Sequence, residues 1–410
     1  MPEQTGPAEM KRTLNSRTLL GEPEENFSLV LGGPLYQLWR RLHAAGPTLD
    51  LLMRRVIGIP LVAWLPLLVL TVYEGVAVGR VVPVPFLYDL DAHARFLVAI
   101  PLLLLGEVVI HQRIRPVVRQ FVDAGIVTPE VLPDFRAAID RAMRLRNSLA
   151  VEVILAVGVF GFGWMVWTET SSLTTSTWYT IVDPAGRHST LAGRWYLHVS
   201  IPIFQFLFYR WYFRLFVWFL FLGRVSRLDL RLTPTHPDRA GGLGFLASAP
   251  VAFALVILAQ AIVVSAVIAG RILFQGDTLQ ANRYVIAGFV ILQLLLVLGP
   301  LCVFAPKLLA LKRRGRREYG ALAARYTREF HAKWIEGAAP PDEPLVGSAD
   351  IQSLADLANS YEVVRGIRAV PFGRDTIIQA AVPALIPFAP LALTVVPAEE
   401  ILKKLLGMLL

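Results

Sequence analysis

The sequence predicts an all-α, polytopic integral membrane protein with about seven transmembrane helices and a small cytosolic helical portion. Hydrophobic residues make up 55% of the 410 residues and charged residues only 17%, whereas soluble domains carry about 25% charged residues. The mean hydropathy is +0.54. The apolar residues gather in blocks of about 20 residues, the length at which a helix crosses a bilayer. Basic residues concentrate in alternate loops between these blocks.

Seven segments have the length and hydropathy expected of a span. The second is the shortest and contains Glu107. The seventh contains Pro383, Pro387 and Pro390, which tend to kink a helix, so it spans only where neighbouring helices satisfy the freed carbonyls. The alternative is six spans plus a re-entrant, proline-rich hairpin. The predicted spans are Val56–Tyr73, Phe96–His111, Leu149–Trp167, Trp195–Leu222, Gly244–Ala269, Tyr284–Ala305 and Thr376–Val396.

The orientation of the spans follows from the Lys and Arg residues that flank them, because cytosolic loops carry the excess. The segment before the first span carries seven basic residues, and the six loops that follow carry two, seven, two, four, two and twelve. This alternation predicts a cytosolic N-terminus in a cytoplasmic (inner) membrane of bacterial type, and a short tail outside. Lys403 and Lys404 in that tail argue against the seventh crossing. The first apolar block follows a long polar lead, so we expect an uncleaved anchor rather than a signal peptide.

The predicted organisation has four parts. Residues 1–55 form a cytosolic segment with interfacial amphipathic helices. Residues 56–305 hold the first six spans, with a cytosolic helical insert at 112–148. Residues 306–374 form a cytosolic helical segment in which apolar positions recur at helical spacing, and residues 375–410 hold the last span and a short tail. The order of spans and inserts suggests a 3+1+3 repeat. The outer loop Thr168–Arg194 is predicted to be a solvated loop.

Ionisable residues inside spans are the first functional candidates, because burying a charge in a bilayer is costly. Glu107 and His111 are spaced four apart in the second span, and Arg210 and Arg214 are spaced four apart in the fourth. Glu107 and Arg210 lie at similar depth, which predicts an ion pair between them. The functional interpretation is a proton or ion relay, or a site for an anionic substrate. The alternative is a fixed ion pair that joins two helices, or arginines that reach the inner headgroups.

Amide side chains inside the spans are a second set of candidates. Gln260, Gln293 and Gln379 lie within predicted spans, as does Gln205. They could line a polar path, but hydrogen bonding between helices is the favoured interpretation. Gln379 lies beside the prolines of the seventh span, which makes that span the best candidate for a broken helix lining a cavity.

The sharpest local motif is the loop Thr233–Phe245, which precedes the fifth span. Its glycines permit close backbone approach, and amides at a helix N-terminus can bind an anion such as a phosphate. The loop matches neither a P-loop nor a dinucleotide fingerprint. A rigid turn is the favoured interpretation, in which the glycines serve backbone geometry. The candidate anion-binding residues are His236, Asp238, Arg239, Gly241, Gly242 and Gly244.

Other classes of site have little support in the sequence. The seven His residues and the lone Cys302 form no metal motif, so we expect no metal and no cofactor. The basic cytosolic segments indicate contact with anionic lipids rather than with nucleic acid. A homo-oligomer or another membrane protein remains a candidate partner.

The leading functional hypothesis is a channel- or transporter-like protein that moves a small solute or ion. It rests on the charged and amide residues within the spans. One alternative is a membrane scaffold or accessory subunit that binds a partner through its basic cytosolic helices. Another is a membrane-embedded enzyme that acts on lipid headgroups around His236. A non-enzymatic role is favoured, since no catalytic arrangement can be recognised.

Overall fold

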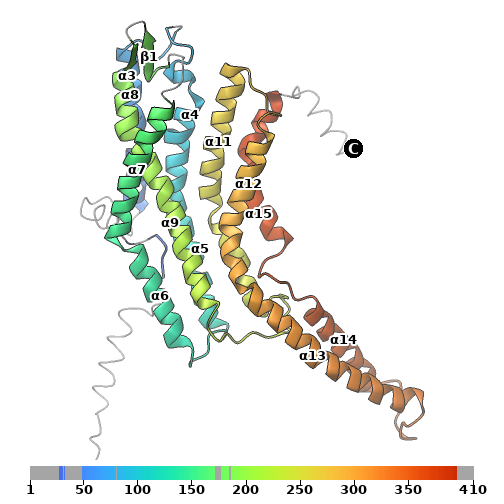
Figure 1. Ribbon diagram of the computed structural model, residues 1–410. Helices are drawn as coiled ribbons and strands as arrows, with labels where there is room; N and C mark the ends of the chain where they lie inside the picture. The colour runs from blue at the N-terminus through green and yellow to red at the C-terminus, as the bar shows by residue number, and fades with distance from the viewer. Residues whose placement is uncertain are drawn as a thin grey trace, which may run out of the picture.

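The computed structural model describes residues 27–30, 32, 49–79, 81–170, 177–183 and 186–394. These residues form an elongated helical bundle from which an arm of two helices projects (Figure 1). The bundle helices run between one end that carries the hairpin of β1 (Thr180–Asp183) and β2 (Gly186–Ser189) and an opposite end that carries α6 and the arm. We call these the hairpin end and the arm end.

The longer helices form the bundle and the arm (Figure 1). They are α3 (Leu49–Tyr73), α5 (Ile100–Asp123), α6 (Leu132–Arg146), α7 (Leu149–Thr170), α9 (Ile201–Val225), α11 (Ala254–Gln275), α12 (Arg283–Leu298), α13 (Ala305–Phe330), α14 (Ala349–Arg365) and α15 (Arg374–Leu385). The shorter ones are α4 (Leu90–His93), α8 (Leu191–Trp195) and α10 (Ala249–Ala252).

Six helical segments of the described residues are long and apolar enough to cross a membrane. The chain is therefore a multi-pass membrane protein. The third predicted span falls on α7, whose described side chains end at Gly161. The part of α7 with described side chains, Leu149–Gly161, forms an apolar helix that is shorter than the six segments. The six segments are Leu52–Tyr73, Leu90–Asp123, Leu191–Val225, Leu243–Gln275, Arg283–Ile335 and Arg374–Leu393.

Prolines account for the π-helical turns that precede α5 and α9. A π-helical turn, Ala94–Ala99, precedes Pro101 at the start of α5, and another, Tyr196–Ser200, precedes Pro202 at the start of α9. Proline has no N–H to donate to the preceding turn, and the backbone there takes the wider form that is found at such interruptions.

Aromatic side chains fill the core at the arm end. Phe121 of α5 contacts Phe135 of α6, with ring centroids 5.6 Å apart, and Phe135 contacts Phe221 of α9 at 6.0 Å. The short segment Phe27–Val30 is buried beside them. The ring of Phe27 lies 4.9 Å from that of Phe221 and 6.2 Å from that of Trp218. Residues from the start of the described chain therefore complete the core between α5, α6 and α9.

The arm consists of α13 and α14 (Figure 1). α13 packs against α14. The Tyr326 hydroxyl of α13 donates to the Asp350 carbonyl at 3.0 Å. Nε1 of Trp334, in the π-helical turn His331–Ile335 that follows α13, donates to the Asp350 carboxylate at 2.9 Å. At the base of the arm, Lys312 Nζ donates to the Ile367 carbonyl at 2.8 Å. These bonds fix the arm to the segment that leads into α15.

The structure corrects the prediction that Thr168–Arg194, before the fourth span, is a solvated loop. The segment holds an antiparallel pair of strands, and Trp178 beside them is fully buried, donating from Nε1 to Asp89 Oδ2 at 2.7 Å. The prediction rested on the polar composition of the loop, which gives no sign that Trp178 packs beside a distant aspartate.

The last predicted span is partly described. α15 continues as a 3-10 helix, Ile386–Thr394, in which Pro387 and Pro390 lie, so the described residues form a continuous segment rather than a hairpin. The last two residues of the predicted span lie outside the described chain, as does most of the predicted N-terminal segment. The structure does not show the 3+1+3 repeat.

Candidate functional site

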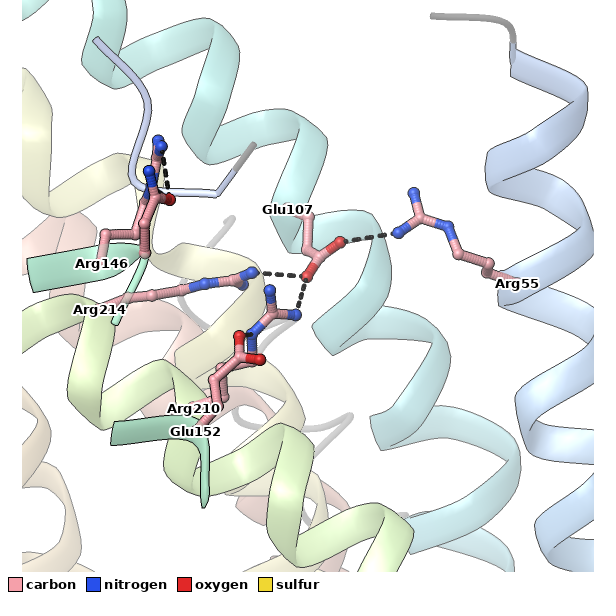
Figure 2. Close-up of polar contacts among 7 residues, drawn as sticks. Arg55, Glu107, Arg146, Glu152, Arg210 and Arg214 are labelled. Carbon is pink, nitrogen blue, oxygen red and sulfur yellow. Dashed lines mark hydrogen bonds and ion pairs between the residues drawn. The ribbon is translucent and has the colours of Figure 1, made fainter. Parts of the chain in front are cut away.

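Glu107 is the centre of a buried network of charges (Figure 2). Its Oε1 accepts from Arg214 Nη2 at 2.8 Å and from Arg210 Nη1 at 3.3 Å, and its Oε2 accepts from Arg55 Nη1 at 3.2 Å. Only 6% of Glu107 is exposed. The predicted contact between Glu107 and Arg210 is therefore confirmed. Three guanidinium groups share one carboxylate.

Helix geometry brings these side chains together. Residues four apart lie on one face of a helix, so Arg210 and Arg214 both point from α9 toward α5 (Figure 2). The guanidinium of Arg214 also lies over the ring of Trp211, 4.5 Å from its centroid. Arg55 comes from the other side, from the second turn of α3. The network therefore joins α3, α5 and α9.

Two more charged residues lie beside this network. Glu152, in the first turn of α7, places Oε1 3.9 Å from Arg210 Nε. Arg146, at the end of α6, donates to the Ser28 carbonyl and, at 2.9 and 3.0 Å, to Asn147 Oδ1. Together with Arg55, Glu107, Arg210 and Arg214 they form what we call the Glu107 cluster.

Among the described residues, the Glu107 cluster holds four arginines and two glutamates, and three of the arginines pair with the glutamates. No carboxylate of the described residues lies within ion-pair distance of Arg146. Burial and, to a lesser degree, the positive charge of Arg214 together lower the pKa of Arg146 to about 10. Such a site favours an added negative charge.

Sequence reasoning found only part of the Glu107 cluster. It identified Glu107, Arg210 and Arg214 but missed Arg55, Arg146 and Glu152. Glu152 lay within the third predicted span and could have been found by the rule that selected Glu107. Arg55 and Arg146 precede spans and resemble the basic flanks that orient a helix. The packing of α3 and α6 against the bundle places these two arginines in the Glu107 cluster, and the sequence alone does not show this packing.

His111 lies apart from the ion pairs of Glu107. Its Nδ1 is 3.0 Å from the Ser28 hydroxyl, so it holds the buried segment Phe27–Val30 instead. Ser28 thus contacts both His111 and Arg146, which places this segment at the edge of the Glu107 cluster.

The buried amides join helices to one another. Gln260 Oε1, on α11, accepts from Gln293 Nε2 of α12 at 2.7 Å and from the Tyr212 hydroxyl of α9 at 2.7 Å. Both glutamines are at most 4% exposed, and the arrangement matches hydrogen bonding between helices. Gln379 is exposed on α15 and lies apart from these two. The structure therefore does not bring the three predicted amides together.

The loop before the fifth span is organised by its own aspartate. The Asp238 carboxylate accepts from the amides of Ala240 and Gly244, both at 2.7 Å, and from the amide of Gly242 at 3.1 Å. It also lies 2.8 Å from His236 Nδ1. Burial raises the pKa of Asp238, but these amides and His236 together outweigh that effect and lower it. An external anion would have to compete with this carboxylate for the same amides.

The glycines of this loop serve backbone geometry. Gly241 and Gly242 have φ of +66° and +100°, a region that disfavours residues with a Cβ atom. Arg239 is also in the left-handed region, with φ of +52°, and its carbonyl accepts from the Arg368 amide at 2.8 Å. The loop therefore fixes the segment that precedes α15. No hydrogen bond or ion pair described in the structure joins it to the Glu107 cluster.

The described residues hold no group of three or more His, Cys, Asp or Glu side chains that could bind a metal ion. Comparisons of the whole chain with protein-family models, with curated protein sequences and with solved structures find no match.

Proposed function

We propose that this protein is a channel- or transporter-like membrane protein that binds a small anion at the Glu107 cluster. The observation that carries the proposal is the grouping of four arginines with two glutamates in the Glu107 cluster. Within the part of the chain that the structure describes, the half-buried Arg146 donates to a carbonyl and an amide oxygen rather than to a carboxylate. A guanidinium group that is withdrawn from water without a neighbouring negative charge lowers the stability of the folded protein. An anionic solute bound beside it would supply that charge.

The chemistry of the Glu107 cluster fits a carboxylate or a phosphate. Guanidinium groups present paired N–H donors whose geometry matches both groups. An anion beside Arg146 and Arg214 would add charge-assisted hydrogen bonds, and it could exchange with Glu107 for the donors of Arg214. Such an exchange gives the solute a transient site within the bundle, which is what a carrier requires.

Arg146→Gln tests this proposal. We expect inorganic phosphate to raise the melting temperature of the purified protein at constant ionic strength, since a ligand of the folded state stabilises it. In the variant the apparent affinity for phosphate should fall by about tenfold or more, as expected for loss of a hydrogen bond to a charged group. The control is Arg325→Gln, which removes a 68% exposed arginine of α13 and should leave the affinity unchanged.

A response to phosphate that is equal in Arg146→Gln and in the unmodified protein would refute the site. No response to phosphate or to acetate would favour the alternative function, a membrane scaffold that binds a partner. The arm favours that alternative, because it projects from the bundle (Figure 1) and leaves Val346 89% exposed and Ile335 67% exposed near its tip.

The proposed location is the cytoplasmic membrane of a bacterial-type cell, with the arm end in the cytosol. The loops at the arm end carry the larger numbers of Lys and Arg residues, which supports this orientation. In a Cys302→Ser background, an impermeant thiol reagent added to intact cells should label Gln280→Cys, at the hairpin end, but not Asp229→Cys, at the arm end. Both positions are exposed. The reverse labelling pattern would overturn the orientation.

A further inference from the structure

A cavity of about 610 Å³ lies between α3, α7 and α9. Its walls are almost entirely apolar and include Gly58, Val62, Phe160, Ile203 and Leu207. The cavity opens sideways, because two of the residues that line it are on the outside of the bundle: Val62 is 50% exposed and Phe160 is 59% exposed. On a helix that crosses a membrane, this side faces lipid.

The two ends of the cavity differ in charge. Arg54 and Arg55 of α3 lie at one end and His198 at the other. Arg54 is exposed, and both arginines lie within the first two turns of α3, at the edge of the apolar segment. Val62 lies about 10 Å further along the helix at 1.5 Å per residue, and its carbonyl accepts from Trp195 Nε1 at 3.3 Å. The cavity therefore extends from the arginines into the apolar part of the span.

We propose that this cavity binds one acyl chain of an anionic phospholipid from the surrounding bilayer, with the phosphate at Arg54. An apolar channel that begins at a guanidinium group is complementary to an anionic headgroup joined to a hydrocarbon chain. Basic residues at a membrane surface attract such headgroups. The chain passes Gly58, where the missing side chain leaves the wall of the cavity open, and lies against Val62 and Ile203.

The apolar walls favour a lipid chain over a small polar solute. A solute or water within the cavity would find few hydrogen-bond partners away from the arginines, and water is retained only where several such partners exist. Arg55 connects the cavity to the Glu107 cluster through its bond to Glu107 Oε2. Arg54 and Gly58 belong to the cavity alone, so the lipid site can be tested separately from the proposed anion site.

Gly58→Leu tests the position of the chain. A side chain at Gly58 meets no atom within 4 Å of its Cβ, so the leucine fills the cavity without disturbing the bundle. Native mass spectrometry of the detergent-purified protein with added phosphatidylglycerol should show one retained lipid, and Gly58→Leu should lose it. The matched control is Gly158→Leu, on α7, where the Cβ also meets nothing within 4 Å and the residue does not line the cavity. This control should retain the lipid.

Arg54→Gln tests the headgroup contact. We expect it to weaken retention of phosphatidylglycerol by about fivefold, the effect of one basic side chain near a membrane surface, and to leave retention of phosphatidylcholine unchanged. Equal lipid retention in Gly58→Leu and Gly158→Leu would refute the cavity as the site. Equal effects on the two lipids in Arg54→Gln would refute the charge contact. Both variants should keep the phosphate response of the unmodified protein, and Arg146→Gln should keep its lipid.

Discussion

Replacing Glu107 with glutamine should destabilise the protein by about 3–5 kcal/mol, the cost of leaving a buried charge without its partner. Arg55, Arg210 and Arg214 all bond to this one carboxylate within 3.3 Å. An amide in its place keeps one acceptor but carries no charge, and its N–H groups face a guanidinium that can only donate. The arginines would then repel one another at a site that water scarcely reaches.

The measurement is the free energy of unfolding in mixed micelles, followed by far-ultraviolet circular dichroism. The double variant Glu107→Gln/Arg214→Gln should lose less than the sum of the two single losses, because it removes a cation together with the anion. Glu362→Gln is the control. It breaks a surface pair with Arg365 in which the glutamate is 65% exposed, and such pairs contribute at most about 1 kcal/mol. Strictly additive losses would show that the cluster does not act as a unit.

Asp238→Ala should destabilise the protein by about 3 kcal/mol or more. Three backbone amides lose the same acceptor, and hydrogen bonds to a charged group contribute about 1.5–3 kcal/mol each. The amides of Ala240, Gly242 and Gly244 would lose the carboxylate that accepts their hydrogen bonds. The loss would fall in a turn whose glycines have positive φ. Asp238→Asn should lose less, since the amide oxygen can still accept.

The contribution of Asp238 should depend on pH in a defined direction. Its pKa is lowered in the folded protein from the ordinary value of 3.8, so the folded state favours the ionised form. The stabilisation is fully present above that value and is lost as the pH falls through the lower, folded pKa. Between neutral pH and about pH 3 the unmodified protein should therefore lose more stability than Asp238→Asn. His236→Ala is the control, because the His236 side chain is 45% exposed and supplies one contact to the Asp238 carboxylate, whereas three amides supply the others. An effect as large as that of Asp238→Ala would contradict the assignment.

The sequence was informative where a single physical requirement selects the residues. Glu107 and Arg210 could be paired because two charges at equal depth in apolar spans have few other partners. The glycines of the Asp238 loop could be assigned to backbone geometry, because glycine adopts positive φ more readily than any other residue. Arg146 could not be placed, because it enters the cluster through the docking of α6 against α9. The burial of Trp178 was unpredictable for the same reason, since it depends on a contact with Asp89.

The buried segment Phe27–Val30 has a consequence for biosynthesis. Phe27 packs against Trp218 and Phe221, residues that the ribosome adds about 190 positions later. At elongation rates of about 5–20 residues per second, roughly 10–40 s pass before that surface exists. During this interval the segment leaves the ribosome without its binding surface, so it docks only after α9 has been inserted. Residues that are translated early are therefore among the last to reach their final positions.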